Sequence, residues 1–193
     1  MSLNITAQTP GLKQGMEPLT AFGKRLPNAQ ANVLNRMLTK TRSAVVPALV
    51  KQTGLTRRII DKAVRPYRAS PQNLHAMIVT RGGQISFRFF GAHEVPGGVA
   101  ATIRGKADFV EGGFRRSGPR GRRVMVAKLN RQVYVNTDGK RWRGHIRVEK
   151  TGMFIPYELV SGQTAATFNR LVVTDLPAEV ERELAKLLPV AGR

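Results

Sequence analysis

The longest regular pattern in the sequence is a run of apolar residues at three- and four-residue spacing that follows Asn28. Its largely apolar members are Val33, Leu34, Met37, Leu38, Thr41, Ala44, Val45, Ala48 and Leu49. This spacing places one apolar stripe along a helix, and Asn28 can cap the first turn. Pro47 lies inside the run, so we expect the helix to kink or divide there. The pattern therefore predicts a long helix over residues 29–52 that buries one face.

A second, shorter helix is predicted directly after the first. Gly54 is a natural stop for the long helix, and Thr56 can cap the next one. The helix, glycine and helix over residues 48–64 have the outline of a helix-turn-helix, in which Arg57 and Arg58 would begin a recognition helix in a DNA major groove. A glycine is also the ordinary way to end one helix and begin another. Both interpretations stay open.

From residue 73 onward the spacing of the apolar residues changes to two, which indicates β-strands. The expected strands cover residues 74–80, 85–90, 99–103, 109–111, 124–129, 133–136 and 142–148, with 153–157 closing the sheet. Gly82 and Gly83 supply the positive φ angles that a hairpin between the first two strands needs. The middle of the chain, residues 73–158, is therefore predicted to form a mostly antiparallel sheet.

Helices return at the end of the chain. One is expected from Gln163 to Leu171, and Asp175 can cap a last helix that has Pro177 in its first turn. The acids Glu179, Glu181 and Glu183 would then lie near a helix start, where the macrodipole favours them. The alternative is an acidic patch that receives a basic surface of a neighbouring copy.

The predicted fold class is α+β. Residues 1–27 are mostly polar and punctuated by proline and glycine, which predicts an extended N-terminal arm, and they lack the pattern of a secretory signal. Residues 28–193 are predicted to form a single domain. Within it, helices cover 29–65, the sheet covers 73–158, and C-terminal helices cover 163–188.

Residues 114–123, here called the basic loop, read Phe-Arg-Arg-Ser-Gly-Pro-Arg-Gly-Arg-Arg. The loop holds five arginines and no acid: Arg115, Arg116, Arg120, Arg122 and Arg123. Gly118, Pro119 and Gly121 interrupt any helical or strand period. Guanidinium groups on a loop suit phosphate oxygens, to which they make paired hydrogen bonds. The loop is predicted to contact phosphates of DNA or an acidic partner; the alternative is a solvated loop that only aids solubility.

The charge of the whole chain favours an anionic partner. The sequence has 32 Lys and Arg against 12 Asp and Glu, a net charge of +20. Such a protein repels itself unless a polyanion is near, and nucleic acid is the usual partner, ahead of an acidic protein. A membrane is not expected, because no apolar stretch approaches the roughly 18 residues needed to span one. A second basic face is predicted on the two N-terminal helices, with Arg36, Lys40, Arg57 and Arg58 as its members.

Few residues suggest catalysis. The histidines are scattered without metal-ligand spacing: His75, His93 and His145. His93 with Glu94, or Asp108 with Glu111, could form an acid–base or metal pair only if the fold brought them together. No nucleophile elbow or phosphate-binding lysine loop is present, and without cysteine there is no thiol chemistry. We therefore expect no enzyme activity, metal, cofactor or small-molecule substrate.

The order of several short segments resembles a known family. These segments are 31–36 (Ala-Asn-Val-Leu-Asn-Arg), 53–55 (Thr-Gly-Leu), 59–60 (Ile-Ile), 112–114 (Gly-Gly-Phe), 155–158 (Ile-Pro-Tyr-Glu), 164–168 and 176–177 (Leu-Pro). Their succession resembles the phage and prophage minor tail protein Z family, the tail completion proteins of lambda-like long-tailed phages. The likeness runs from about Ala29 to Leu188 and rests on scattered residues and element order.

The resemblance implies a structural virion protein, assembled in the host cytoplasm, that acts late in tail assembly at the head-proximal end of the tail. Its implied partners are the tail terminator, the head–tail connector, further copies in a ring, and the backbone of packaged DNA. In this hypothesis the sheet and first helix build the subunit contacts. The alternatives are a DNA-binding regulator that uses residues 48–64 and an RNA-binding basic protein like those of ribosomes.

Overall fold

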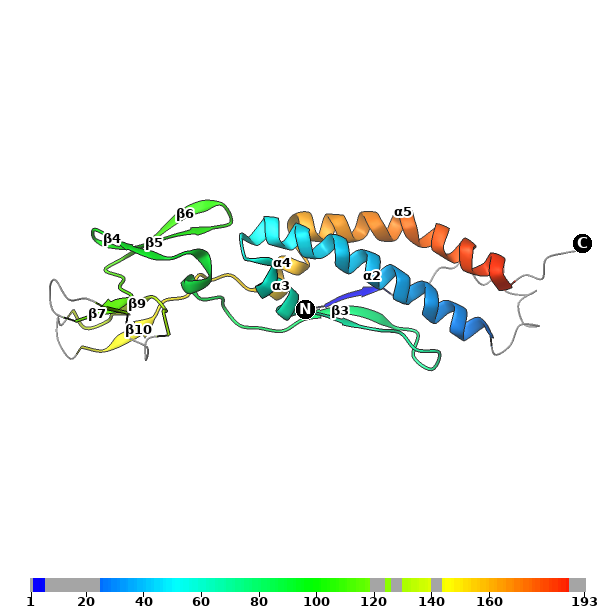
Figure 1. Ribbon diagram of the computed structural model, residues 1–193, viewed down its shortest axis with the longest axis horizontal. Helices are drawn as coiled ribbons and strands as arrows, with labels where there is room; N and C mark the ends of the chain where they lie inside the picture. Colours follow the sequence, from blue (N-terminus) through cyan, green and yellow to red (C-terminus); the bar gives the residue numbers. More distant parts are fainter. Residues whose placement is uncertain (1, 6–24, 119–123, 126–129, 140–143, 188–193) are drawn as a thin grey trace, which may run out of the picture.

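The computed structural model describes residues 2–5, 25–118, 124–125, 130–139 and 144–187. The fold is α+β and elongated, with two long helices at one end and small sheets at the other (Figure 1). We call β1 to β3 with all the α-helices the helical half. The segment from residue 85 to residue 150 is the β half.

Two long antiparallel helices dominate the helical half (Figure 1). They are α2 (Arg25–Thr53) and α5 (Gly162–Leu187), and the short helices α3 (Arg57–Ala63) and α4 (Ile155–Leu159) lie near the C-terminal end of α2. The predicted apolar stripe is the buried face of α2. Its most enclosed members are Leu34, Met37, Leu38, Val45, Val46 and Leu49. The long helix and the short one after it are therefore confirmed.

Both long helices continue through a proline. Of the two outcomes expected at Pro47, a kink or a division, the division is wrong, because α2 continues to Thr53. The separate last helix capped by Asp175 is also wrong, because α5 runs through Pro177. A proline inside a helix leaves the carbonyl four residues earlier without its bond. Here both prolines and the residues four positions earlier, Ser43 and Val173, are exposed, so water can bond these carbonyls.

A three-stranded antiparallel sheet covers part of α2. It consists of β1 (Ser2–Ile5), β3 (Ala76–Thr80) and β2 (Val64–Tyr67), with β3 in the centre. Alternate residues of β3 are buried toward the core. The expectation of an extended arm over residues 1–27 is wrong at both ends, because Ser2–Ile5 pair with β3 and α2 begins at Arg25. The rest of that arm lies outside the described residues.

The described residues of the β half form three small antiparallel sheets. They are formed by β4 (His93–Val95), β5 (Gly98–Ile103) and β6 (Lys106–Glu111), by β7 (Arg116–Ser117) and β8 (Val124–Met125), and by β9 (Tyr134–Asn136) and β10 (Ile146–Val148). The antiparallel pairing is confirmed, but one continuous sheet is wrong. Predicted strand residues 126–129 and 142–143 lie outside the described residues.

Two predicted strands have other structures. Residues Phe87–Phe90 form a 3-10 helix, η2, because Ser86 caps its start and Phe87 and Phe90 are buried. The predicted hairpin is absent from the described residues, since β3 pairs with β1 and β2 instead. Residues 153–157, expected to close the sheet, lead into α4, where Pro156 occupies the first turn, a position that proline favours.

A polar cluster joins the two halves. The side-chain amide of Gln52 donates to Glu158 Oε2 at 2.7 Å and to the Glu158 carbonyl at 3.1 Å. The Gln52 oxygen accepts from the backbone nitrogen and hydroxyl of Thr164, at 3.0 and 2.9 Å. Arg104, in the turn between β5 and β6, donates to Glu158 Oε1 from Nε at 3.1 Å. Because the Glu158 side chain is only 4% exposed, these bonds satisfy a buried carboxylate and fix that turn against the helices.

Candidate basic surface

The start of the basic loop is fixed by Arg115. Its guanidinium donates from Nη1 to the carbonyl of Ala92, and from Nε and Nη2 to the carbonyl of Arg131 at 3.3 and 3.1 Å. The backbone nitrogens of Arg115 and Arg116 both donate to Glu94 Oε1, at 2.6 and 2.8 Å. Burial lowers the pKa of Arg115; Glu94 acts in the opposite direction, while Arg131 and Arg116 lower it further. Arg115 therefore holds the loop in place.

The rest of the basic loop is carried by a strand pair. Arg116 pairs with Met125 and Ser117 with Val124, so β7 and β8 hold its two ends together. Arg116 is exposed in β7. Arg120, Arg122 and Arg123 lie outside the described residues. The structure therefore brings together Arg115 and Arg116 in different roles: the Arg115 guanidinium binds backbone carbonyls, whereas Arg116 is exposed.

Two further cations involve the segment 130–131 that Arg115 binds. Arg131 supplies the carbonyl that Arg115 binds, and its φ of 56° places it in the left-handed region. The Arg88 guanidinium lies 4.5 Å from the centre of the Phe89 ring and donates to the Asn130 carbonyl at 3.2 Å. Sequence reasoning missed both cations, because they reach this region only through contacts between distant segments.

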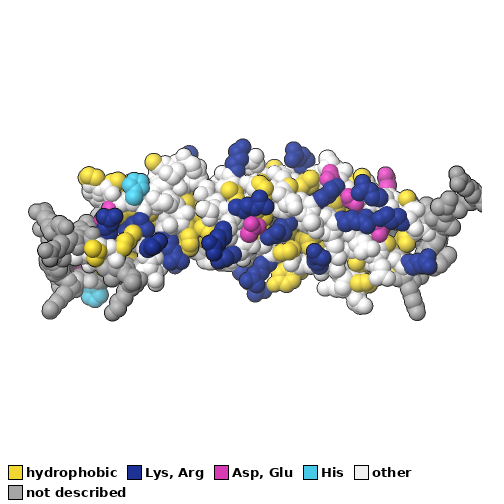
Figure 2. All heavy atoms as spheres, viewed as in Figure 1, with side chains coloured by type: hydrophobic (Ala, Val, Ile, Leu, Met, Phe, Trp, Pro, Cys, Tyr) yellow, Lys and Arg dark blue, Asp and Glu magenta, His cyan; other side chains and the backbone are white. Residues whose placement is uncertain are grey.

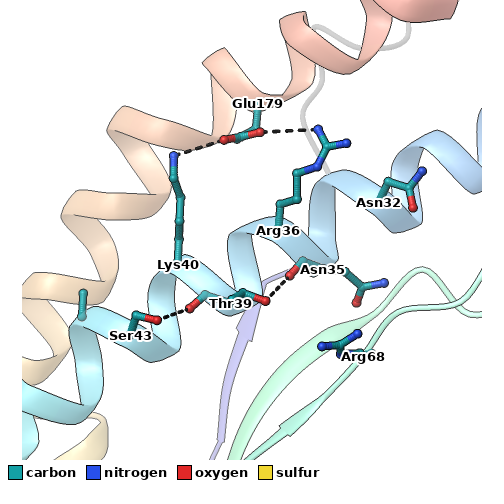
Figure 3. Close-up of a pocket in the computed structure, with 9 residues that line it drawn as sticks. Asn32, Asn35, Arg36, Thr39, Lys40, Ser43, Arg68 and Glu179 are labelled. Atoms are coloured by element: carbon teal, nitrogen blue, oxygen red, sulfur yellow. Dashed lines mark hydrogen bonds and ion pairs between the residues drawn. The ribbon is translucent and has the colours of Figure 1, made fainter.

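The predicted second basic face is divided in the structure. Arg36 and Lys40 point from α2 toward α5 (Figure 3). Arg36 Nη1 lies 2.8 Å from Glu183 Oε2, and Lys40 Nζ lies 3.1 Å from Glu179 Oε1. Lys40 also contacts Asp175 at 3.3 Å. The expected outer face of cations therefore carries acids of α5 beside Arg36 and Lys40.

The acids of α5 also differ from prediction. Glu179 and Glu183 lie far beyond the start of α5 at Gly162 and are nearly buried against α2, so the helix-start interpretation is wrong. The hydrogen bond from Lys40 lowers the pKa of Glu179, and that from Lys186 lowers the pKa of Glu183. The acids hold the two long helices together. Glu181 is exposed.

The remaining members of that face lie in α3. Arg57 Nε lies 3.4 Å from Asp61 Oδ2, and Asp61 also accepts from Arg42 at 3.1 Å. Arg58 is exposed. Thr56 occupies the N-cap position, but its side chain makes no capping bond within the described residues. Gly54 joins α2 to α3 as predicted for a helix-turn-helix, yet α3 continues directly into strand β2.

The predicted acid–base residues are used otherwise. His93 and Glu94 are neighbours in β4, so their side chains leave opposite faces of the strand. His145 Nδ1 lies 3.3 Å from Asp138, and His75 is exposed. Among the described residues, no cluster of three His, Cys, Asp or Glu could hold a metal ion. No helix in the described part is long and apolar enough to cross a membrane.

Comparison with known proteins identifies no relative of this chain. No protein-family model matches it. No curated protein and no solved structure shows significant similarity either.

Proposed function

We propose that this chain is a structural phage tail protein that acts at the head-proximal end of the tail, in tail completion and head–tail joining. The observation that carries the proposal is the cation surplus: even if every acid neutralises one cation, a charge of +20 remains. Lys and Arg are spread along most of the face shown in Figure 2. Such a surface is stabilised by a polyanion, and packaged DNA supplies one at that position.

The positions of the residues that carry the family resemblance support the proposal. Gln52, directly before the 53–55 segment, bonds both Glu158 and Thr164, which belong to two other of these segments. Thr53, Glu158 and Thr164 are all buried at this junction. Three of the segments that carry the resemblance therefore contribute residues to one buried junction.

The basic loop supplies a contact in this proposal. Its described residues, 114–118, include β7, which lies in the β half at one end of the elongated molecule (Figure 1). Arg115 anchors the loop while Arg116 is exposed beside it. Several copies in a ring would present such loops to DNA in the channel or to an acidic neighbour.

A loop variant tests the proposal. Arg116, Arg120, Arg122 and Arg123 are changed to Ser, while Arg115 stays because it holds the loop in place. The protein is supplied from a plasmid to a phage deleted for its gene, and plaque titre is measured. We expect folded protein and a large loss of infectious particles.

The matched control removes four exposed cations elsewhere and should keep the titre near normal. These are Lys51, Lys106, Lys150 and Arg170. Mass spectrometry of purified particles should detect the unaltered protein. Normal titre with the loop variant, or absence of the protein from particles, would contradict the proposal.

The alternative function is a DNA-binding regulator that uses residues 48–64, and the turn at Gly54 is the observation that favours it. A salt titration on two unrelated duplexes separates the functions. A tail protein should bind both duplexes equally, with affinity falling steeply as salt rises. A regulator should prefer one duplex and lose that preference in Arg57→Ala.

A further inference from the structure

A small hollow lies on the outer side of the sheet in the helical half. Its volume is about 290 Å³, and its lining is formed by Lys62, Ala63, Arg65, Tyr67, Val79 and Arg81. Arg65 lies opposite Val79 in the pairing of β2 with β3. Because alternate residues of a strand share a face, Tyr67 and Arg81 lie on the same side as this pair. Val64 and Ile78, on the other side, are buried in the core.

The lining contains three cations and no acid. Asp61 is the nearest acid in sequence, and its carboxylate binds Arg42 at 3.1 Å and Arg57 at 3.4 Å. Like charges around one hollow repel each other, and an anion bound among them would reduce that repulsion. This part of the surface thus differs from the space between α2 and α5, where acids meet the cations.

The hollow also offers an aromatic surface. The Tyr67 side chain lines it, and that residue is 45% exposed. Proteins that bind nucleic-acid strands combine cations along the backbone with exposed aromatic rings on which bases stack. The volume is near the lower limit of the roughly 300–1,000 Å³ of small-molecule pockets, which suits one phosphate with part of its nucleoside.

We propose that this hollow binds one backbone phosphate of a nucleic acid. Lys62, Arg65 and Arg81 contact the phosphate oxygens, and Tyr67 packs against the adjoining sugar or base. The site is a second nucleic-acid contact, in the helical half, whereas the basic loop lies in the β half. The inference rests on the proposed function for the class of partner. Its test uses purified protein, so its failure would leave the infectivity test unaffected.

Binding is measured by fluorescence anisotropy with a labelled oligonucleotide, single-stranded or duplex, at several salt concentrations. The hollow variant is Lys62→Ala, Arg65→Ala and Arg81→Ala combined. Its control combines Lys51→Ala, Lys106→Ala and Lys150→Ala, which removes the same charge from exposed positions. We expect the hollow variant to bind at least about tenfold more weakly, because hydrogen bonds to a charged group are lost. The slope of log affinity against log salt concentration should also become shallower, by about the amount that one phosphate contact contributes. Equal weakening in both variants would overturn the proposal.

A second measurement locates the anion. Inorganic phosphate titrated into the full-length protein should shift the backbone amide signals of residues 62–67 and 79–81, and this response should vanish in the hollow variant. In phosphate-free buffer the hollow variant should have the higher Tm, because the like charges are gone. Shifts confined to other residues would overturn the assignment. If the hollow variant fails to fold, Arg65→Gln and Arg81→Gln are tested singly for the same loss of the response to phosphate.

Two further comparisons test the class of partner. Tyr67→Phe should keep the affinity for single strands and Tyr67→Ala should lower it, since only the ring stacks. Polyglutamate should bind the hollow variant and its control alike. If the hollow variant instead loses polyglutamate binding as strongly as DNA binding, the site recognises an acidic protein and the proposal is wrong.

Discussion

Arg36 and Lys40 of the helical half and Arg115 of the β half are held by different kinds of partner. In the helical half, Arg36 and Lys40 pair with carboxylates of α5. In the β half, the Arg115 guanidinium is held by the carbonyl oxygens of Ala92 and Arg131. A carboxylate cancels a cation's charge, whereas a carbonyl oxygen fixes its position and leaves the charge in place. The number of cations in a region therefore does not by itself tell how much charge that region presents.

Packing differs between the halves as well. The largest fully buried side chains outside the β half include Leu34, Met37, Leu38, Leu49, Leu55, Ile60, Ile78 and Leu159. Among the residues of the β half that the structure describes, the buried hydrophobic ones are Phe87, Phe90, Ala92, Val99, Ala101 and Val133. Burial of apolar surface is the main stabilising contribution, so the helical half should be the more stable one. Four measurements test whether the two halves differ in this way.

The largest effect is expected in the core of the helical half. Leu49 is fully buried in α2, so Leu49→Ala should lower the free energy of unfolding by about 2–5 kcal/mol. Urea denaturation followed by circular dichroism measures the change. Val173→Ala is the control, because that side chain is 74% exposed and its loss should cost less than about 0.5 kcal/mol. Equal costs for the two variants would contradict the described core.

A backbone contact gives the next largest effect, in the β half. A Cβ added at Gly98 would lie 2.1 Å from the Val110 carbonyl oxygen, so Gly98→Ala must push β5 and β6 apart. We expect a cost of about 1–3 kcal/mol, as for overpacking. Gly83→Ala is the control, because its Cβ would meet nothing within 4 Å. Amide hydrogen exchange should accelerate in the β half only, and protection equal to that of the control would refute the pairing.

A smaller effect is expected from Arg115→Lys. Lysine keeps the charge, but it lacks the planar guanidinium that binds the Ala92 and Arg131 carbonyls at the same time. The local cost should be about 1 kcal/mol, since hydrogen bonds are lost without loss of charge. Hydrogen exchange near β4 and β7 should accelerate, while exchange in α2 stays unchanged. Arg147→Lys, at an exposed position, should have no such effect.

The smallest effect concerns pH. Hydrogen bonds lower the folded-state pKa of Glu179 and Glu183 below the ordinary 4.5, with Lys40 and Lys186 as the respective donors. A depressed pKa adds stability above the unfolded value, and this stability is lost as pH falls through the folded value. Acid should therefore loosen the α2–α5 contact below pH 4.5. The urea midpoint should fall less on acidification in Glu179→Gln than in the unaltered protein; an equal fall would refute the pairing.

The sequence predicted the elements with long periodic patterns better than the contacts between them. The stripe that includes Leu34 and Leu49 identified α2, because a helix of that length repeats its pattern many times. The pairing of Lys40 with Glu179 spans 139 residues, and no local pattern reports it. Short elements were also missed: the 3-10 helix at 87–90 and α4 each resemble a strand in composition.

The candidate site was predicted only in part for the same reason. The composition of the basic loop marked Arg115 as a cation available to a partner. Its hydrogen bonds to Ala92 and Arg131 depend on chain segments that approach only after folding. The hollow beside Tyr67 likewise needs the register of β2 against β3, which two short strands do not reveal in sequence.

The placement of acids between α2 and α5 affects how copies of this protein interact with one another. With those carboxylates turned inward, two molecules meet mainly through positive surfaces and repel at low ionic strength. Added electrolyte shortens the range of that repulsion and lets molecules approach each other, while the same ions weaken attachment to a phosphate chain. Ionic strength should thus drive self-contact and nucleic-acid contact in opposite directions.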